Sequence, residues 1–73
     1  MMTRGEHVRW CKGRALEYLD MGRPDMAMSS MVSDMGKHPE TEDVIRQQLT
    51  AGMVELKTSG AEGVRRWIEG FGE

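Results

Sequence analysis

The chain has 73 residues, and its 10 Lys and Arg against 12 Asp and Glu give a formal net charge of −2. This length allows one small domain, which buries only about 60% of its unfolded surface and is often marginally stable alone. No apolar run exceeds three residues, so we expect neither a membrane span nor a signal peptide. Charges of both signs are mixed along the chain, which argues against nucleic acid as the default partner. The single cysteine, Cys11, cannot form a disulfide within the chain and fits a reducing cytoplasm.

The clearest signal in the sequence is a pair of helices joined by a Gly-Arg-Pro turn. Gly22 can adopt the left-handed conformation that ends a helix, and Pro24 suits the first turn of the next one. The first helix is expected over residues 3–22, since Thr3 and Glu6 have the spacing of a capping box. Its apolar positions recur at three- and four-residue steps: Val8, Cys11, Ala15, Leu16, Tyr18 and Leu19.

Three more helical segments follow. A second helix is expected over residues 24–35 and a third over 41–58, after a linker in which His38 precedes Pro39 and is therefore kept out of the α region. A short helix over 61–70, preceded by a second capping-box spacing, ends the pattern. The apolar stripes that support these helices are Ala27, Met28, Met31, Val32 and Met35, then Val44, Ile45, Leu49, Met53 and Leu56, and finally Val64, Trp67, Ile68 and Phe71. Because strand-like alternation is missing, the sequence predicts one all-α domain, a bundle of three to four helices built on an antiparallel helical hairpin.

Two glycines fall inside the expected helices. Gly13 weakens the first helix by about 1 kcal/mol relative to alanine. Either another segment packs closely against Gly13 or the helix simply tolerates it, and we favour tolerance. Gly52 is expected to make the third helix irregular.

Residues 14–39 resemble a single helical hairpin of the tetratricopeptide type. The matching positions are Ala15, Tyr18, Gly22, Ala27, Met31 and Pro39. The resemblance implies that the two alanines let the helices approach closely while the larger side chains fill the space beside the contact. Cys11, Arg14 and Asp34 depart from the pattern, because the repeat prefers large apolar residues at the first two positions and a small one at the third.

A broader resemblance covers most of the chain. The stretches EHVRWCKGRALEYLDMG, SSMVSDMGKHPET and RRWIEGF are similar to segments that occur in the same order in a group of small uncharacterised proteins encoded by tailed bacteriophages and prophages. The resemblance implies a phage origin and a site of action in the cytoplasm of the infected bacterium. It implies no particular activity.

Candidate chemistry is sparse. His7 and Cys11 share a helix face, and a returning linker would bring His38 towards them as a three-ligand metal site. Structural zinc sites use about four ligands, and a lone thiol in an apolar stripe is more often a core residue. A Cys11 nucleophile would also need a group that orients the imidazole and an oxyanion hole, and the sequence suggests neither. We therefore expect no enzyme, no metal site and no cofactor.

The methionines and one tryptophan indicate a binding surface. Five of the eight methionines lie within residues 21–35, too many for one buried stripe. Trp10 lies off the stripe of its helix, and tryptophan is favoured at interface centres. Arg14 and Asp34 either join this surface or pair with each other across the hairpin, and we favour the pair. The candidate partner-binding residues are Trp10, Arg14, Met26, Met28, Asp34 and His38, of which Met26 and Met28 are expected to face different ways.

Three functions are compatible with these observations. The first is a protein-interaction module that binds and modulates a host protein, with components of antiviral defence among the candidates, and we expect it to be a homodimer. The second is a nucleic-acid-binding regulator, because basic residues gather around Trp10 in the first helix. The third is a structural, self-assembling phage component. We favour the first of these.

Overall fold

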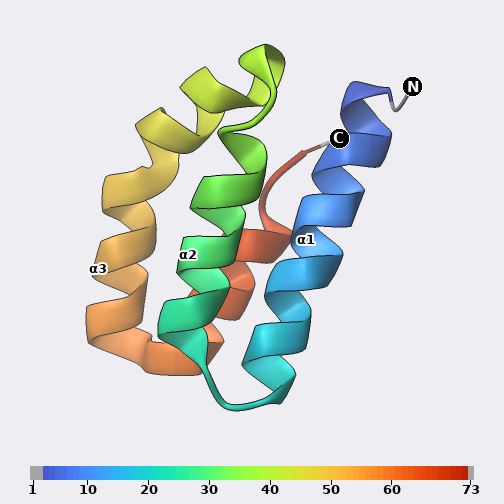
Figure 1. The fold of residues 1–73 in the computed structure, drawn as a ribbon. Helices are drawn as coiled ribbons and strands as arrows, with labels where there is room; N and C mark the ends of the chain where they lie inside the picture. The colour runs from blue at the N-terminus through green and yellow to red at the C-terminus, as the bar shows by residue number, and fades with distance from the viewer. Residues whose placement is uncertain (1–2, 73) are drawn as a thin grey trace.

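The computed structural model describes residues 3–72, which form three α-helices and no strand. The helices are α1 (Arg4–Asp20), α2 (Pro24–Met35) and α3 (Pro39–Glu69). Figure 1 shows α1 and α2 as an antiparallel pair, with the first part of α3 beside α2. The last part of α3 turns back behind α2 towards α1. The predicted all-α bundle is therefore confirmed.

The hairpin between α1 and α2 forms as predicted. The Thr3 hydroxyl accepts the backbone N–H of Glu6 at 3.1 Å, and the Glu6 carboxylate accepts the backbone N–H of Thr3 at the same distance, which completes the capping box. Gly22 has a φ of 75°, and Arg23 donates its N–H back to the Tyr18 carbonyl at 2.9 Å. These bonds end α1 at Asp20, and the left-handed glycine is what reverses the chain.

The start of α3 differs from the prediction by two residues. His38 is extended, with a φ of −121°, as its position before a proline predicts. Pro39 and Glu40 are helical, however, and were wrongly placed in the linker. The reason is that His38 itself acts as the N-cap: its Nδ1 accepts the Glu40 N–H at 3.1 Å, and a proline suits the first helical position. The buried Thr41 hydroxyl donates to the Met35 carbonyl at 2.6 Å, which connects the first turn of α3 to the last residue of α2.

Gly60 divides α3 where the sequence suggested two helices. Its backbone is not helical, with φ 58° and ψ −136°, a conformation that essentially only glycine adopts without strain. Residues 61–69 therefore fold back onto the preceding part of α3. The approach is close, because a Cβ built on Gly63 would lie 2.5 Å from the Glu55 carbonyl oxygen.

The core lies between the three helices. The buried apolar residues are Val8, Cys11, Ala15, Leu19, Ala27, Met28, Met31, Met35, Ile45, Val64, Trp67, Ile68 and Phe71. All four predicted apolar positions of the last segment are in this set. The predicted stripe over 41–58 is only partly correct, because Met53 is 47% exposed. The part of α3 before Gly60 is covered by the rest of the bundle on one side only. Its apolar stripe is wider than this covered side, so Met53 remains exposed.

Glycine also sets the contact between α3 and its returning end. The helix is regular through Gly52, so the predicted irregularity there is wrong. A Cβ on Gly52 would lie 2.6 Å from Trp67 Cε2 and 2.9 Å from Met28 Cε, and the missing side chain is what admits the indole. Gly13 has nothing within 4 Å of its Cβ position, which agrees with tolerance.

The end of the described chain is fastened to α1. Phe71 is buried, and Lys12 donates to the Phe71 carbonyl at 2.9 Å and to the Glu69 carbonyl at 3.4 Å. The lysine thus supplies a cation and donors at the carboxyl end of α3, where backbone carbonyls lack helical partners. This contact ties the carboxyl end of α3 to the middle of α1.

Candidate functional site

An exposed tryptophan is the centre of the candidate site. Trp10 is 41% exposed although its ring has a neighbour on each side along α1. His7, three residues earlier, stacks at a centroid distance of 6.2 Å and an interplanar angle of 22°. Arg14, four residues later, places its guanidinium carbon 5.0 Å from the indole centroid, within cation–π range. These two contacts restrict the rotation of an otherwise solvent-facing ring.

Asp34 of α2 anchors the arginine. The Arg14 Nε donates to Asp34 Oδ2 at 2.8 Å, so the predicted pairing across the hairpin is confirmed. Ser30 donates to the same oxygen at 3.3 Å, and Lys37 donates to Oδ1 at 3.4 Å. Asp34 is only 2% exposed, and its burial is tolerable because both carboxylate oxygens are bonded to donors. The buried Asp34 carboxylate therefore holds the Arg14 guanidinium in its position over Trp10.

Two imidazoles extend the site towards α3. The ring of His38 lies 5.3 Å from that of His7, with an interplanar angle of 36°. We call the six residues His7, Trp10, Arg14, Asp34, Lys37 and His38 the Trp10 cluster. It joins α1, the end of α2 with the turn after it, and the N-cap of α3 in one continuous set of contacts.

The Cys11 thiol lies in the core next to His7, in surroundings that disfavour its thiolate. Cys11 is fully buried, and its Sγ lies 3.7 Å from His7 Nε2. Burial, together with the negative charge of Asp34, raises the pKa of Cys11 to about 11, so the thiolate is scarce at neutral pH. Within residues 3–72, no three His, Cys, Asp or Glu side chains are arranged to hold a metal ion.

The structure therefore gathers four of the six predicted site residues: Trp10, Arg14, Asp34 and His38. Met26 is 39% exposed, whereas Met28 is buried at 6% and packs against Gly52. The two methionines face different ways, as predicted, and Met28 belongs to the core. His7 and Lys37 were missed. The position of His7, one helical turn before Trp10, was a usable signal, but the contact between Lys37 and Asp34 depends on the path of the chain after α2.

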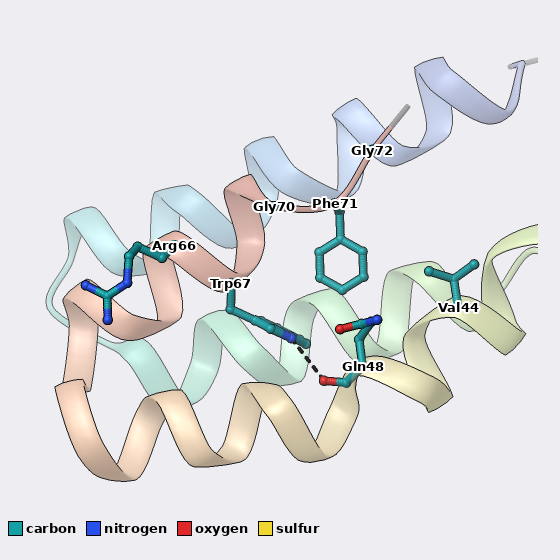
Figure 2. Close-up of a pocket in the computed structure, with 7 residues that line it drawn as sticks. All are labelled: Val44, Gln48, Arg66, Trp67, Gly70, Phe71 and Gly72. Carbon is teal, nitrogen blue, oxygen red and sulfur yellow. Dashed lines mark hydrogen bonds between the residues drawn. The ribbon is translucent and has the colours of Figure 1, made fainter.

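A groove lies on another part of the molecule, between the long part of α3 and the chain end. Figure 2 shows its lining, and its volume is about 390 Å³. The Trp67 and Phe71 rings meet edge to face at 5.1 Å, and the Trp67 indole N–H donates to the Gln48 carbonyl at 3.0 Å. Arg66, at one end, pairs with Glu55 at 3.2 Å. The groove is an aromatic recess in which the Trp67 indole N–H and the Arg66 guanidinium already have partners inside the chain.

Comparisons with protein-family models, curated proteins and solved structures found no match to this chain. Within the part that the structure describes, none of the helices combines the length and the apolar character needed to cross a membrane.

Proposed function

We propose that this protein is a small phage-encoded interaction module that binds and modulates a host protein in the bacterial cytoplasm. The observation that carries the proposal is an exposed tryptophan whose ring is already held between His7 and Arg14. A side chain ordered before binding loses little conformational entropy in the complex, and tryptophan and arginine are the residues that most often dominate binding energy. The phage setting rests on the sequence resemblance, and a component of antiviral defence is a candidate partner.

The charges around Trp10 favour a protein partner over a nucleic acid. The Arg14 guanidinium is already engaged by the Asp34 carboxylate. The exposed side chains of Glu6 and Glu17 lie one turn before Trp10 and two turns after it. A phosphate backbone requires a basic surface, and these carboxylates interrupt it. A protein surface, which presents both charges and apolar groups, matches this mixture better.

We further propose that the chain acts as a homodimer. Large exposed apolar side chains within residues 3–72 include Met21, Met26, Met53 and Val54, and a domain of this size has few means of covering them alone. Light scattering after size exclusion should give twice the 8.3 kDa mass of one chain. A single-chain mass at every concentration would contradict the dimer. A ladder of larger species would favour a self-assembling phage component.

Affinity capture from a host lysate tests the proposed function. Tagged protein is compared with Trp10→Ala and with Met53→Ala, which removes an apolar side chain of similar exposure from α3. Capture at low and high salt, with and without nuclease, separates protein partners from nucleic acid. We expect a host protein that survives salt and nuclease, disappears with Trp10→Ala and remains with Met53→Ala. Recovery of the bait alone, or equal capture by both variants, would refute the proposal.

A further inference from the structure

We propose that a second copy of this chain pairs with the first along the outer face of α3, antiparallel and about a two-fold axis at Thr50. This inference rests on the homodimer proposed above and names its interface. It does not use the surface proposed for the host protein. Trp10 and Arg14 belong to α1, and Figure 1 places α1 and the part of α3 before Gly60 on opposite sides of α2.

The outer face of α3 carries a stripe of exposed residues at heptad spacing. Its members lie four, three, four and three residues apart: Asp43, Gln47, Thr50, Val54 and Lys57. This is the spacing of the contact seam between two helices that pack at a small crossing angle. Thr50 is the midpoint of the stripe, because Asp43 and Lys57 each lie two heptad turns away from it. The stripe ends before the bend at Gly60, so one continuous helix presents it.

The centre of this face is uncharged and partly apolar. Residues 47–54, QQLTAGMV, include no charged side chain, although 30% of the chain is charged. Met53 and Val54 are 47% and 51% exposed. Thr50 and Ala51 are exposed as well, and their short side chains allow a second helix to approach closely. A helix that packs here therefore buries apolar surface without burying an ion at the centre of the contact.

The two ends of the stripe carry opposite charges. Within residues 3–72, neither Asp43 nor Lys57 forms an ion pair. In a two-fold antiparallel pair, each Asp43 lies opposite the Lys57 of the other copy, so the same attractive contact occurs twice. A parallel pair would instead bring like charges together at both ends. The face is therefore complementary to itself, and its charges select a second copy in the antiparallel arrangement.

The charges beside the stripe do not oppose this pairing. Arg46 pairs with Glu42 at 3.5 Å, and Glu55 pairs with Arg66 at 3.2 Å. These four side chains are neutralised in pairs within each copy. Antiparallel packing also brings the amino end of one helix dipole towards the carboxyl end of the other, which is the favourable arrangement.

Charge reversal tests the interface. Asp43→Lys and Lys57→Asp each convert both intermolecular ion pairs into like-charge pairs, which should raise the dissociation constant of the dimer roughly 30-fold. An equimolar mixture of the two variants restores both pairs and should recover the dimer mass in light scattering. The variant that carries both changes should recover it too. Glu17→Lys is the matched control, because it makes the same change in charge at an exposed position of α1 and should dimerise like the wild type.

The substituted side chains are exposed, so circular dichroism should show the helix content of the wild type in every variant. Single variants that dimerise as tightly as the wild type, or a mixture that keeps the single-chain mass, would overturn this interface and leave the homodimer in place. A wild type with the single-chain mass at every concentration would refute the homodimer and the interface together. In both cases, capture with Trp10→Ala decides separately whether the host protein binds.

Discussion

Replacing Gly63 with alanine measures how closely the two parts of α3 approach. The new Cβ would lie 2.5 Å from the Glu55 carbonyl oxygen, whereas a carbon and a carbonyl oxygen normally stay roughly 3.3 Å apart. The parts must therefore separate by roughly 0.8 Å, and because the obstacle is backbone, no rotamer change can relieve it. Overpacking of this kind costs about 1–3 kcal/mol, which outweighs the gain in helix propensity of at most about 1 kcal/mol.

Gly13→Ala is the matched control. It makes the same chemical change in the middle of a helix but has nothing within 4 Å of the new Cβ, so it should stabilise the protein by about 0.5–1 kcal/mol. Thermal unfolding followed by circular dichroism should shift by about 4–8 °C per kcal/mol for a domain of this size, downwards for Gly63→Ala and upwards for Gly13→Ala. If Gly63→Ala unfolds at the same temperature as Gly13→Ala or above it, the returning segment does not pack as described.

Other changes test separate parts of the structure. Gly60→Ala should lower the free energy of unfolding by about 1–3 kcal/mol, because alanine is strained at the positive φ of this position. The midpoint of urea unfolding should fall accordingly, and an unchanged midpoint would mean that the chain does not fold back at residue 60. Arg14→Ala should lower the free energy of unfolding by about 1 kcal/mol, because Lys37 still contacts the Asp34 carboxylate. In urea unfolding, the double variant of Arg14→Ala and Lys37→Ala should lose more stability than the two single variants together. Simple additivity would contradict a buried carboxylate shared by the two cations. Burial raises the pKa of Cys11 from 9.0 to about 11, so the unfolded chain releases this proton first and stability should fall between those pH values. Urea unfolding at several pH values should show this loss in the wild type and not in Cys11→Ala, and the same slope in both would contradict it.

Local chemistry made the hairpin predictable. The spacing of Thr3 and Glu6, the left-handed Gly22 and Pro24 at the start of α2 each act within a few residues of sequence, and each is present as predicted. The buried stripe of α2 also follows directly from helical periodicity. The pairing of Arg14 with Asp34 was predictable because both positions depart from the apolar pattern of a plain hairpin.

Tertiary contacts set the rest. Periodicity gives the face of a helix but not its distance from a neighbour, so the roles of Gly52 and Gly63 as contact points could not be foreseen. The exposure of Met53 has the same origin, since nothing in the sequence says that the long part of α3 is covered on one side only. In the candidate site, the contact between the tilted rings of His7 and His38 depends on where the N-cap of α3 returns to α1.

The two tryptophans allow the most direct test of the proposed binding surface. Trp10 is exposed within its cluster, whereas the Trp67 indole N–H is bonded to Gln48 inside the bundle. A ¹H–¹⁵N spectrum therefore contains one indole resonance from the proposed interface and one from the core. On addition of the captured host protein, the Trp10 resonance should shift or broaden well beyond that of Trp67. A complex that forms while the Trp10 resonance stays unchanged would contradict the proposal that this side chain is the anchor.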